Sequence, residues 1–177
     1  MLLRRIFTAS LPLALYLLGV AACASAPPGV PPAEPASPGR ICTEMGCVDG
    51  LTIELQSPAG WQPGAYRFEI ELDQEKVTCE GSLPLRGCDQ GASVQCTPAG
   101  GAERVQIAES GCALPPAEHS LPQIALPGGP ARVKVTISRD GNAIGSQELS
   151  PAYRTVAPNG PECGPVCRQA SAVITLR

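Results

Sequence analysis

Aromatic residues are scarce in this 177-residue chain, which contains one Trp, three Tyr and two Phe. Beyond residue 23 only four remain, namely Trp61, Tyr66, Phe68 and Tyr153. So few rings cannot form rows of exposed aromatic side chains that stack on nucleic-acid bases or on sugars. The hydrophobic core must therefore consist mainly of aliphatic side chains.

Residues with catalytic or metal-binding chemistry are equally few. The single histidine, His119, lies between Glu118 and Ser120, and consecutive residues do not point at one another as a catalytic triad requires. No cysteine lies beside it to complete a zinc site. The chain also lacks a Ser-x-x-Lys motif, a nucleotide-binding glycine loop and an EF-hand. We expect His119 to be an exposed loop residue and the protein to be no enzyme, with no metal and no cofactor. A hydrolase around His119 and Glu118 is the alternative.

Long apolar runs are absent except at the N-terminus. There, IFTASLPLALYLLGVAA follows Arg4 and Arg5, has the length of a signal-peptide core, and is short for a stable membrane span. It ends in Val20-Ala21-Ala22-Cys23, which resembles the lipobox of bacterial lipoproteins, the type II signal peptide. The resemblance implies cleavage before Cys23 and acylation, with palmitate among the acyl groups, of its sulfur and its new amino group. Ala24 stands where an inner-membrane retention signal has Asp, which implies the outer membrane.

The lipidated cysteine would be followed by a tether. Residues 24–39 read ASAPPGVPPAEPASPG, a composition that favours extended polyproline geometry of roughly 3 Å per residue, or about 50 Å in all. Two or more acyl chains anchor a protein stably to a bilayer. We therefore divide the chain into a signal peptide (1–22), a lipidated cysteine with its tether (23–39) and one domain (40–177). The domain would face the periplasm or the cell surface.

Negative charge predominates after the leader. Cleavage would remove two of the 13 basic residues and none of the 16 acidic ones, so the mature chain carries a formal net charge of −5. An acidic chain is a poor partner for nucleic acid. Glu69, Glu71, Asp73 and Glu75 alternate along one predicted strand and its turn. We expect a solvated outer face there, with a calcium site or a cationic partner as the alternative.

Alternation of apolar and polar residues is the main structural signal. It predicts half-buried strands at 51–55, 65–72, 132–138 and 171–176, with further candidates at 76–80, 92–97, 104–109 and 143–149. Asp140-Gly141 is a hairpin signal between two such runs, and a second predicted hairpin aligns with it on Asp73. The prolines of residues 113–130 exclude a long helix. We predict an all-β fold, an antiparallel β-sandwich of seven to nine short strands.

A short motif supports the sandwich. Residues 63–68, PGAYRF, resemble the Pro-Gly-x-Tyr stretch that precedes a strand in prealbumin-like domains and in B-type domains of collagen adhesins. The resemblance implies an immunoglobulin-like or prealbumin-like sandwich and carries no information about function.

The cysteines outside the lipobox are even in number. In an exported chain they predict four disulfides. They are Cys42, Cys47, Cys79, Cys88, Cys96, Cys112, Cys163 and Cys167.

The stretch Cys163-Gly-Pro-Val-Cys167 is one residue longer than the Cys-Gly-Pro-Cys of thioredoxins. A thioredoxin-type cysteine lies at a helix N-terminus, where exposed amides lower its pKa, whereas the residues after Cys167 form a strand pattern. We therefore expect structural, oxidised cysteines at both positions.

The pairing is left open by the sequence. If the first and last strands pair in parallel, as in many such sandwiches, the first two cysteines of the domain lie near the last two, and two cross-terminal bridges result. Local bridges 42–47 and 163–167 are the alternative. For the middle four cysteines, antiparallel pairing gives 79–96 with 88–112, and sequential pairing gives 79–88 with 96–112.

The mature chain as a whole resembles lipoproteins of myxobacteria in CTEMGCVDGLTIEL, SGCALPP and PNGPECGPVCRQAS. Such proteins have no established activity, so the resemblance implies a location and no mechanism. The expected function is a non-catalytic module that is held at the membrane through Cys23 and binds an envelope protein or polymer. A purely structural envelope lipoprotein is the alternative.

Overall fold

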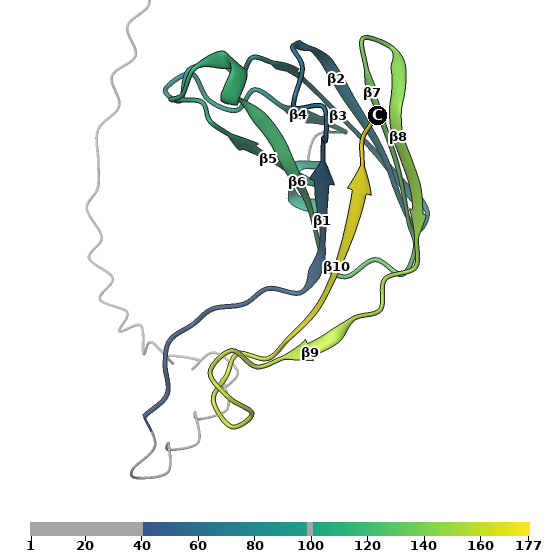
Figure 1. Ribbon diagram of the computed structural model, residues 1–177. Coiled ribbons are helices and arrows are strands. Elements are labelled where there is room, and N and C mark those ends of the chain that lie inside the picture. Colours follow the sequence, from purple (N-terminus) through teal and green to yellow (C-terminus); the bar gives the residue numbers. More distant parts are fainter. Residues whose placement is uncertain (1–40, 99–100) are drawn as a thin grey trace, which may run out of the picture. The chain divides into compact units, whose positions relative to one another are not determined.

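The alternating runs form two five-stranded sheets (Figure 1) in a computed structural model that describes residues 41–98 and 101–177. The predicted signal peptide, Cys23 and the tether lie outside the described residues. The elements are β1 Gly50–Gln56, β2 Gly64–Leu72, β3 Glu75–Leu83, β4 Gln95–Thr97, α1 Gly101–Arg104, β5 Gln106–Ser110, the 3-10 turn η1 Pro116–Glu118, β6 Ser120–Pro127, β7 Val133–Arg139, β8 Asn142–Leu149, β9 Arg154–Val156 and β10 Cys167–Thr175.

The predicted β-sandwich is confirmed, with ten strands in the described residues instead of seven to nine. One sheet has the order β5-β6-β1-β10-β9 and the other β4-β3-β2-β7-β8. Neighbouring strands pair antiparallel except β1 and β10, the first and the last, which pair in parallel as expected. The strands that the sequence did not predict are β6, which contains prolines, and β9, which has only three residues. Neither shows a clear alternation of apolar and polar residues.

The core between the sheets is aliphatic, as the scarcity of aromatics requires. Phe68 is the one aromatic side chain with no exposed surface among the described residues. Each such buried side chain stabilises the fold by about 1.5–3 kcal/mol relative to an exposed one. The largest fully buried side chains are Phe68, Leu51, Ile53, Ile70, Leu121, Ile124, Leu126, Ile137, Val77, Val105, Val133 and Val135.

Strand β6 lies inside its sheet although its sequence, SLPQIALP, contains two prolines. The sequence did not predict it, because proline cannot donate a hydrogen bond to a neighbouring strand. Pro122 lies where the β5–β6 register shifts, between Ala108 and Ser110, and β1 pairs only with residues from Gln123 onward. Pro122 therefore occupies a position at which no ladder bond is lost.

The two hairpins that align in the sequence lie side by side, because β2 of one pairs antiparallel with β7 of the other. Asp73 directly follows β2 and accepts hydrogen bonds from the backbone N–H groups of Ala131 and Arg132, while its own N–H donates to the Arg132 carbonyl. Asp140 directly follows β7; its carboxylate accepts from the N–H of Ala65, the second residue of β2, and its own N–H donates to the Ala65 carbonyl. Both aspartates have left-handed backbones, with φ of 53° and 49°. Each hairpin turn is thus bonded to the start of the neighbouring antiparallel strand.

The middle four cysteines form the antiparallel pairing. Cys79 and Cys96 are opposite each other on β3 and β4 and are bonded to each other. Cys88 and Cys112 connect the loop after β3 to the loop after β5.

In the ranges 41–98 and 101–177, no helix is both long and apolar enough to cross a membrane.

Candidate functional site

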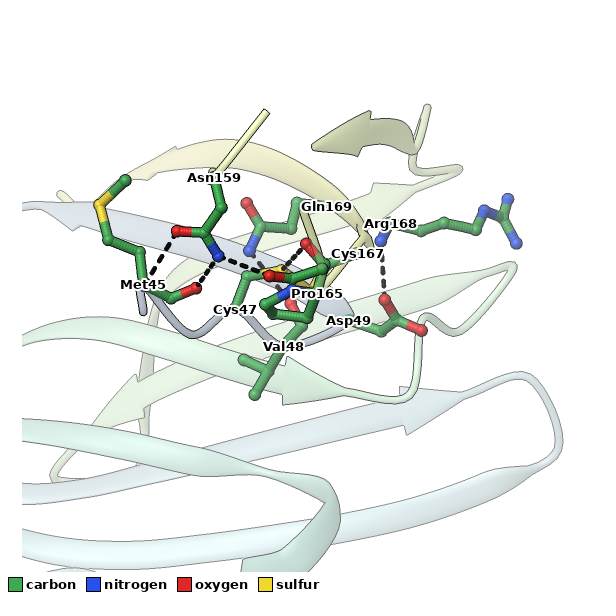
Figure 2. Close-up of a disulfide and its surroundings, with 10 residues drawn as sticks. Met45, Cys47, Val48, Asp49, Asn159, Pro165, Cys167, Arg168 and Gln169 are labelled. Atoms are coloured by element: carbon green, nitrogen blue, oxygen red, sulfur yellow. Dashed lines mark hydrogen bonds between the residues drawn. A yellow bond between two sulfur atoms is a disulfide. The ribbon is translucent and has the colours of Figure 1, made fainter. Parts of the chain in front are cut away.

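The beginning and the end of the domain are joined by two disulfides. Cys42 is bonded to Cys163 and Cys47 to Cys167, at sequence separations of 121 and 120 residues. The structure therefore has the cross-terminal pairing, and the local bridges 42–47 and 163–167 are not formed. We call the two cross-linked segments, residues 41–49 and 157–169, the terminal clamp (Figure 2).

Asn159 connects the two segments of the clamp with its side-chain amide. Its Oδ1 accepts hydrogen bonds from the Thr43 hydroxyl at 2.6 Å and the Met45 N–H at 3.0 Å. Its Nδ2 donates to the carbonyls of Met45 at 2.8 Å and Gly164 at 2.7 Å (Figure 2). The amide thus uses both donor hydrogens and both acceptor positions. Only an amide side chain offers this combination, so Asn159 fixes the clamp in a way that the cysteines alone do not.

A second set of bonds joins the clamp to the parallel strands. One carboxylate oxygen of Asp49 accepts from the backbone N–H of Arg168 at 2.7 Å, and the Gln169 amide donates to the Val48 carbonyl at 3.1 Å (Figure 2). Directly afterwards, Gly50 pairs with Gln169 as the first residues of the β1–β10 ladder. A Cβ at Gly50 would lie 2.6 Å from the Leu126 carbonyl oxygen, so only glycine fits at this point.

A groove of about 710 Å³ lies beside the clamp, over the first residues of β1. Its lining residues come mainly from β5, β6, β1, β10 and β9. These five strands are neighbours in one sheet (Figure 1). Its lining consists of Val48, Asp49, Gly50, Leu51, Thr52, Gln106, Ala125, Leu126, Pro127, Ala152, Arg154, Val156, Gln169, Ala170 and Ser171.

The strand register orders the outward-facing lining residues into two rows across the sheet. In the first row, Pro127, Gly50, Gln169 and Arg154 are successive partners on β6, β1, β10 and β9. In the second, Gln106, Ala125, Thr52 and Ser171 are successive partners on β5, β6, β1 and β10. Opposed residues on paired strands share a face of the sheet. Small residues such as Gly50 and Ala125 therefore form the floor in the middle of the groove. The Gln106 amide lies toward its β5 end, and the Gln169 amide and the Arg154 guanidinium lie toward its β9 end.

The chemistry of the groove is that of a polar binding surface. Thr52 and Ser171 contribute hydroxyls, Gln106 and Gln169 contribute amides, and no aromatic residue lines it. Arg154 is exposed and makes no ion pair with any residue in the part of the chain that the structure describes. An unpaired guanidinium presents a planar set of donors that fits a carboxylate.

The Cys-Gly-Pro-Val-Cys stretch lacks the geometry of a thioredoxin site. Cys163 and Cys167 are bonded to different partners on the other segment of the clamp and not to each other. Cys167 is the first residue of strand β10, so no helix N-terminus adjoins it. Both side chains are buried, with 7% and 5% exposure.

His119 is not the exposed loop residue that the sequence predicted, since it is 5% exposed. The backbone N–H of Leu85 donates to its Nδ1 at 2.9 Å, so its Nε2 carries the proton and donates to the Leu114 carbonyl at 2.9 Å. The Cys88–Cys112 disulfide holds these loops together, and the histidine side chain fills the space between them. Glu118 ends the 3-10 turn and is exposed.

The predicted acidic stripe is paired with protein groups. Glu69 lies 3.3 Å from Lys76 and 3.5 Å from Arg67, and the hydrogen bond and charge of Lys76 are the main causes that lower the pKa of Glu69. Glu75 pairs with Arg104 and Glu71 with Lys134, and Asp73 bonds the backbone before β7. Among the described residues, no group of three or more His, Cys, Asp or Glu side chains is placed to hold a metal ion.

The residues of the groove and the clamp, other than the cysteines, were missed by the sequence reasoning. Asn159 lies in a Pro/Gly-rich loop in which no periodic signal singles it out. Arg154 lies on β9, a three-residue strand too short to show alternation.

No protein-family model, no curated protein and no solved structure matches this chain, so its site is described by its own geometry alone.

Proposed function

We propose that this protein is a lipid-anchored lipoprotein of the outer membrane, facing the periplasm or the cell surface, and that its β-sandwich is a non-catalytic module that binds an envelope protein or polymer. The anchor is Cys23, on the resemblance of residues 20–23 to a lipobox. The observation that supports a binding module best is the groove across β5, β6, β1, β10 and β9.

Two properties of the groove favour a binding role. Its volume of about 710 Å³ lies within the roughly 300–1,000 Å³ typical of ligand sites. Its floor is formed by paired strands, and one wall, Val48 and Asp49, belongs to the cross-linked clamp. A preformed, rigid surface loses little conformational entropy when a ligand binds. The cross-links thus have a role in holding a recognition surface as well as in stabilising the fold.

The groove is tested by filling it. Arginine at Ser171 would project a long side chain over the small-residue floor, whereas arginine at Thr175, on the same face of the same strand, lies outside the groove. The mature chain carrying Cys23→Ser, which lacks the lipid anchor, is incubated with a washed envelope fraction, and the bound amount is measured by sedimentation. We expect Ser171→Arg to lose binding and Thr175→Arg to keep it. Equal retention of both variants and of the wild type would favour a purely structural lipoprotein.

The anchor is tested separately. Cys23→Ser should abolish incorporation of a labelled fatty acid and release the protein from the membrane, while the fold of the domain is unchanged. Membrane retention and acyl labelling equal to those of the wild type would contradict lipidation at Cys23.

A further inference from the structure

The groove has the length of a short extended chain lying across the strands. From Gln106 on β5 to Arg154 on β9, it crosses five neighbouring strands. Strands are spaced about 4.8 Å apart, so the two ends are separated by about 19 Å. An extended peptide rises about 3.3 Å per residue and covers this distance with about five or six residues.

The lining distinguishes a peptide from a sugar polymer. No aromatic ring lines the groove, and therefore nothing in it provides the flat apolar surface on which a sugar ring stacks. The Gln106 and Gln169 amides and the Thr52 and Ser171 hydroxyls both donate and accept, which is what a peptide backbone requires. The small floor at Gly50 and Ala125 allows a backbone to approach the sheet closely, provided that its own side chains are small.

Charge identifies one end of the occupant. Arg154 is exposed at the β9 end and makes no ion pair with the described residues. Asp49, directly before the central strand β1, has one carboxylate oxygen occupied by the Arg168 N–H. The remaining oxygen of Asp49 can accept an N–H, and the guanidinium of Arg154 can hold a carboxylate in a two-point contact.

We infer that the groove binds an extended peptide with small side chains, whose C-terminal carboxylate pairs with Arg154. The inference rests on the proposed function, because it specifies the partner of the same groove. It makes the bound partner an envelope protein, whose C-terminal tail lies across β6, β1 and β10.

The test uses a defined probe, N-acetyl-pentaalanine with a free C-terminal carboxylate, and the same peptide with an amidated C-terminus. Binding to the mature chain carrying Cys23→Ser is followed through backbone amide shifts in NMR titrations. We expect shifts at Thr52, Gln169 and Ser171. Amidation of the peptide, or the change Arg154→Gln, should weaken binding about fivefold or more. Arg86→Gln, an exposed arginine in the loop after β3, is the matched control and should leave binding unchanged.

Each other outcome overturns the inference. No groove shifts at millimolar peptide, shifts confined to other strands, or equal binding of the acid and the amide would all contradict it. Stronger binding of a galacturonate trimer than of the peptide would assign the groove to a sugar polymer. If Ser171→Arg still abolishes envelope binding in these cases, the binding module stands and only its peptide partner is wrong.

Discussion

The terminal clamp predicts that its two disulfides stabilise the protein non-additively. Cys42–Cys163 and Cys47–Cys167 close loops of nearly the same size, at separations of 121 and 120 residues. In the chain-entropy treatment, the first bridge to close such a loop restricts the unfolded chain by about 5 kcal/mol. Once it is closed, the second bridge closes only a ring of about ten residues within the clamp, which is worth about 3 kcal/mol.

Replacing both cysteines of either bridge by alanine should therefore cost only about 3 kcal/mol, because the other bridge still closes the long loop. Removing both bridges should cost about 8 kcal/mol, about 2 kcal/mol more than the sum of the two separate losses. The total loss of about 8 kcal/mol is much of the 5–15 kcal/mol by which a typical domain is stable.

Denaturant unfolding of the mature chain without reductant measures these differences, followed by the fluorescence of Trp61, which packs against Tyr66 at 5.7 Å between ring centroids. The denaturant dependence is fitted separately for each variant, because removing a cross-link expands the unfolded chain. The reasoning is refuted if the double removal costs no more than the sum of the single ones, or if each single removal costs about 5 kcal/mol.

Three further predictions concern single residues. Asp140→Ala should lower the free energy of unfolding by about 1–3 kcal/mol, measured with denaturant, because it removes the hydrogen bond to Ala65 and places alanine at a φ of 49°. Asp140→Asn keeps the hydrogen bond and tolerates that backbone conformation. Equal losses of stability in the two variants would count against this prediction. His119→Phe should cost about 2–4 kcal/mol because it leaves the Leu85 N–H and the Leu114 carbonyl unpaired, and a variant as stable as the wild type would contradict this. Tyr153 has a pKa raised above 10.0, mainly by burial and then by the charge of Asp73. Because the pKa is raised in the folded state, the contribution of the neutral Tyr153 side chain to stability is complete below about pH 10 and is lost as the pH rises through the folded-state pKa. The urea midpoint should therefore fall more steeply above about pH 10 in the wild type than in Tyr153→Phe. Parallel pH dependences of the two midpoints would show the reasoning to be wrong.

Local patterns were enough to predict the sandwich. Alternation located most of the long strands, because each has one face on the core, as Tyr66, Phe68 and Ile70 do on β2. Asp140-Gly141 identified the β7–β8 hairpin because both residues adopt left-handed backbones. The expected parallel pairing of the first and last strands also led to the cross-terminal bridges as one of two alternatives, and the structure has them.

Features that depend on non-local register were not predictable. Strand β6 tolerates Pro122 only because a register shift in its neighbour removes the need for a donor there. His119 is buried because loops far apart in the sequence close over it, and its polar neighbours in the sequence gave the opposite expectation. The groove exists because β9 adds to the edge of β10 and brings Arg154 into line with Gln169 and Gly50.

The intact mass of the protein extracted from the membrane in detergent tests the central claim most directly, since it reports the anchor and the bridges together. The sample is treated with an alkylating reagent under denaturing conditions, without reductant. We predict a chain that begins at Cys23, carries the mass of its acyl groups, and gains no alkyl group, since all eight cysteines of the domain are oxidised. A chain without acyl groups, or one alkylated at two or more thiols, would contradict the account of a lipid-anchored module held by its disulfides.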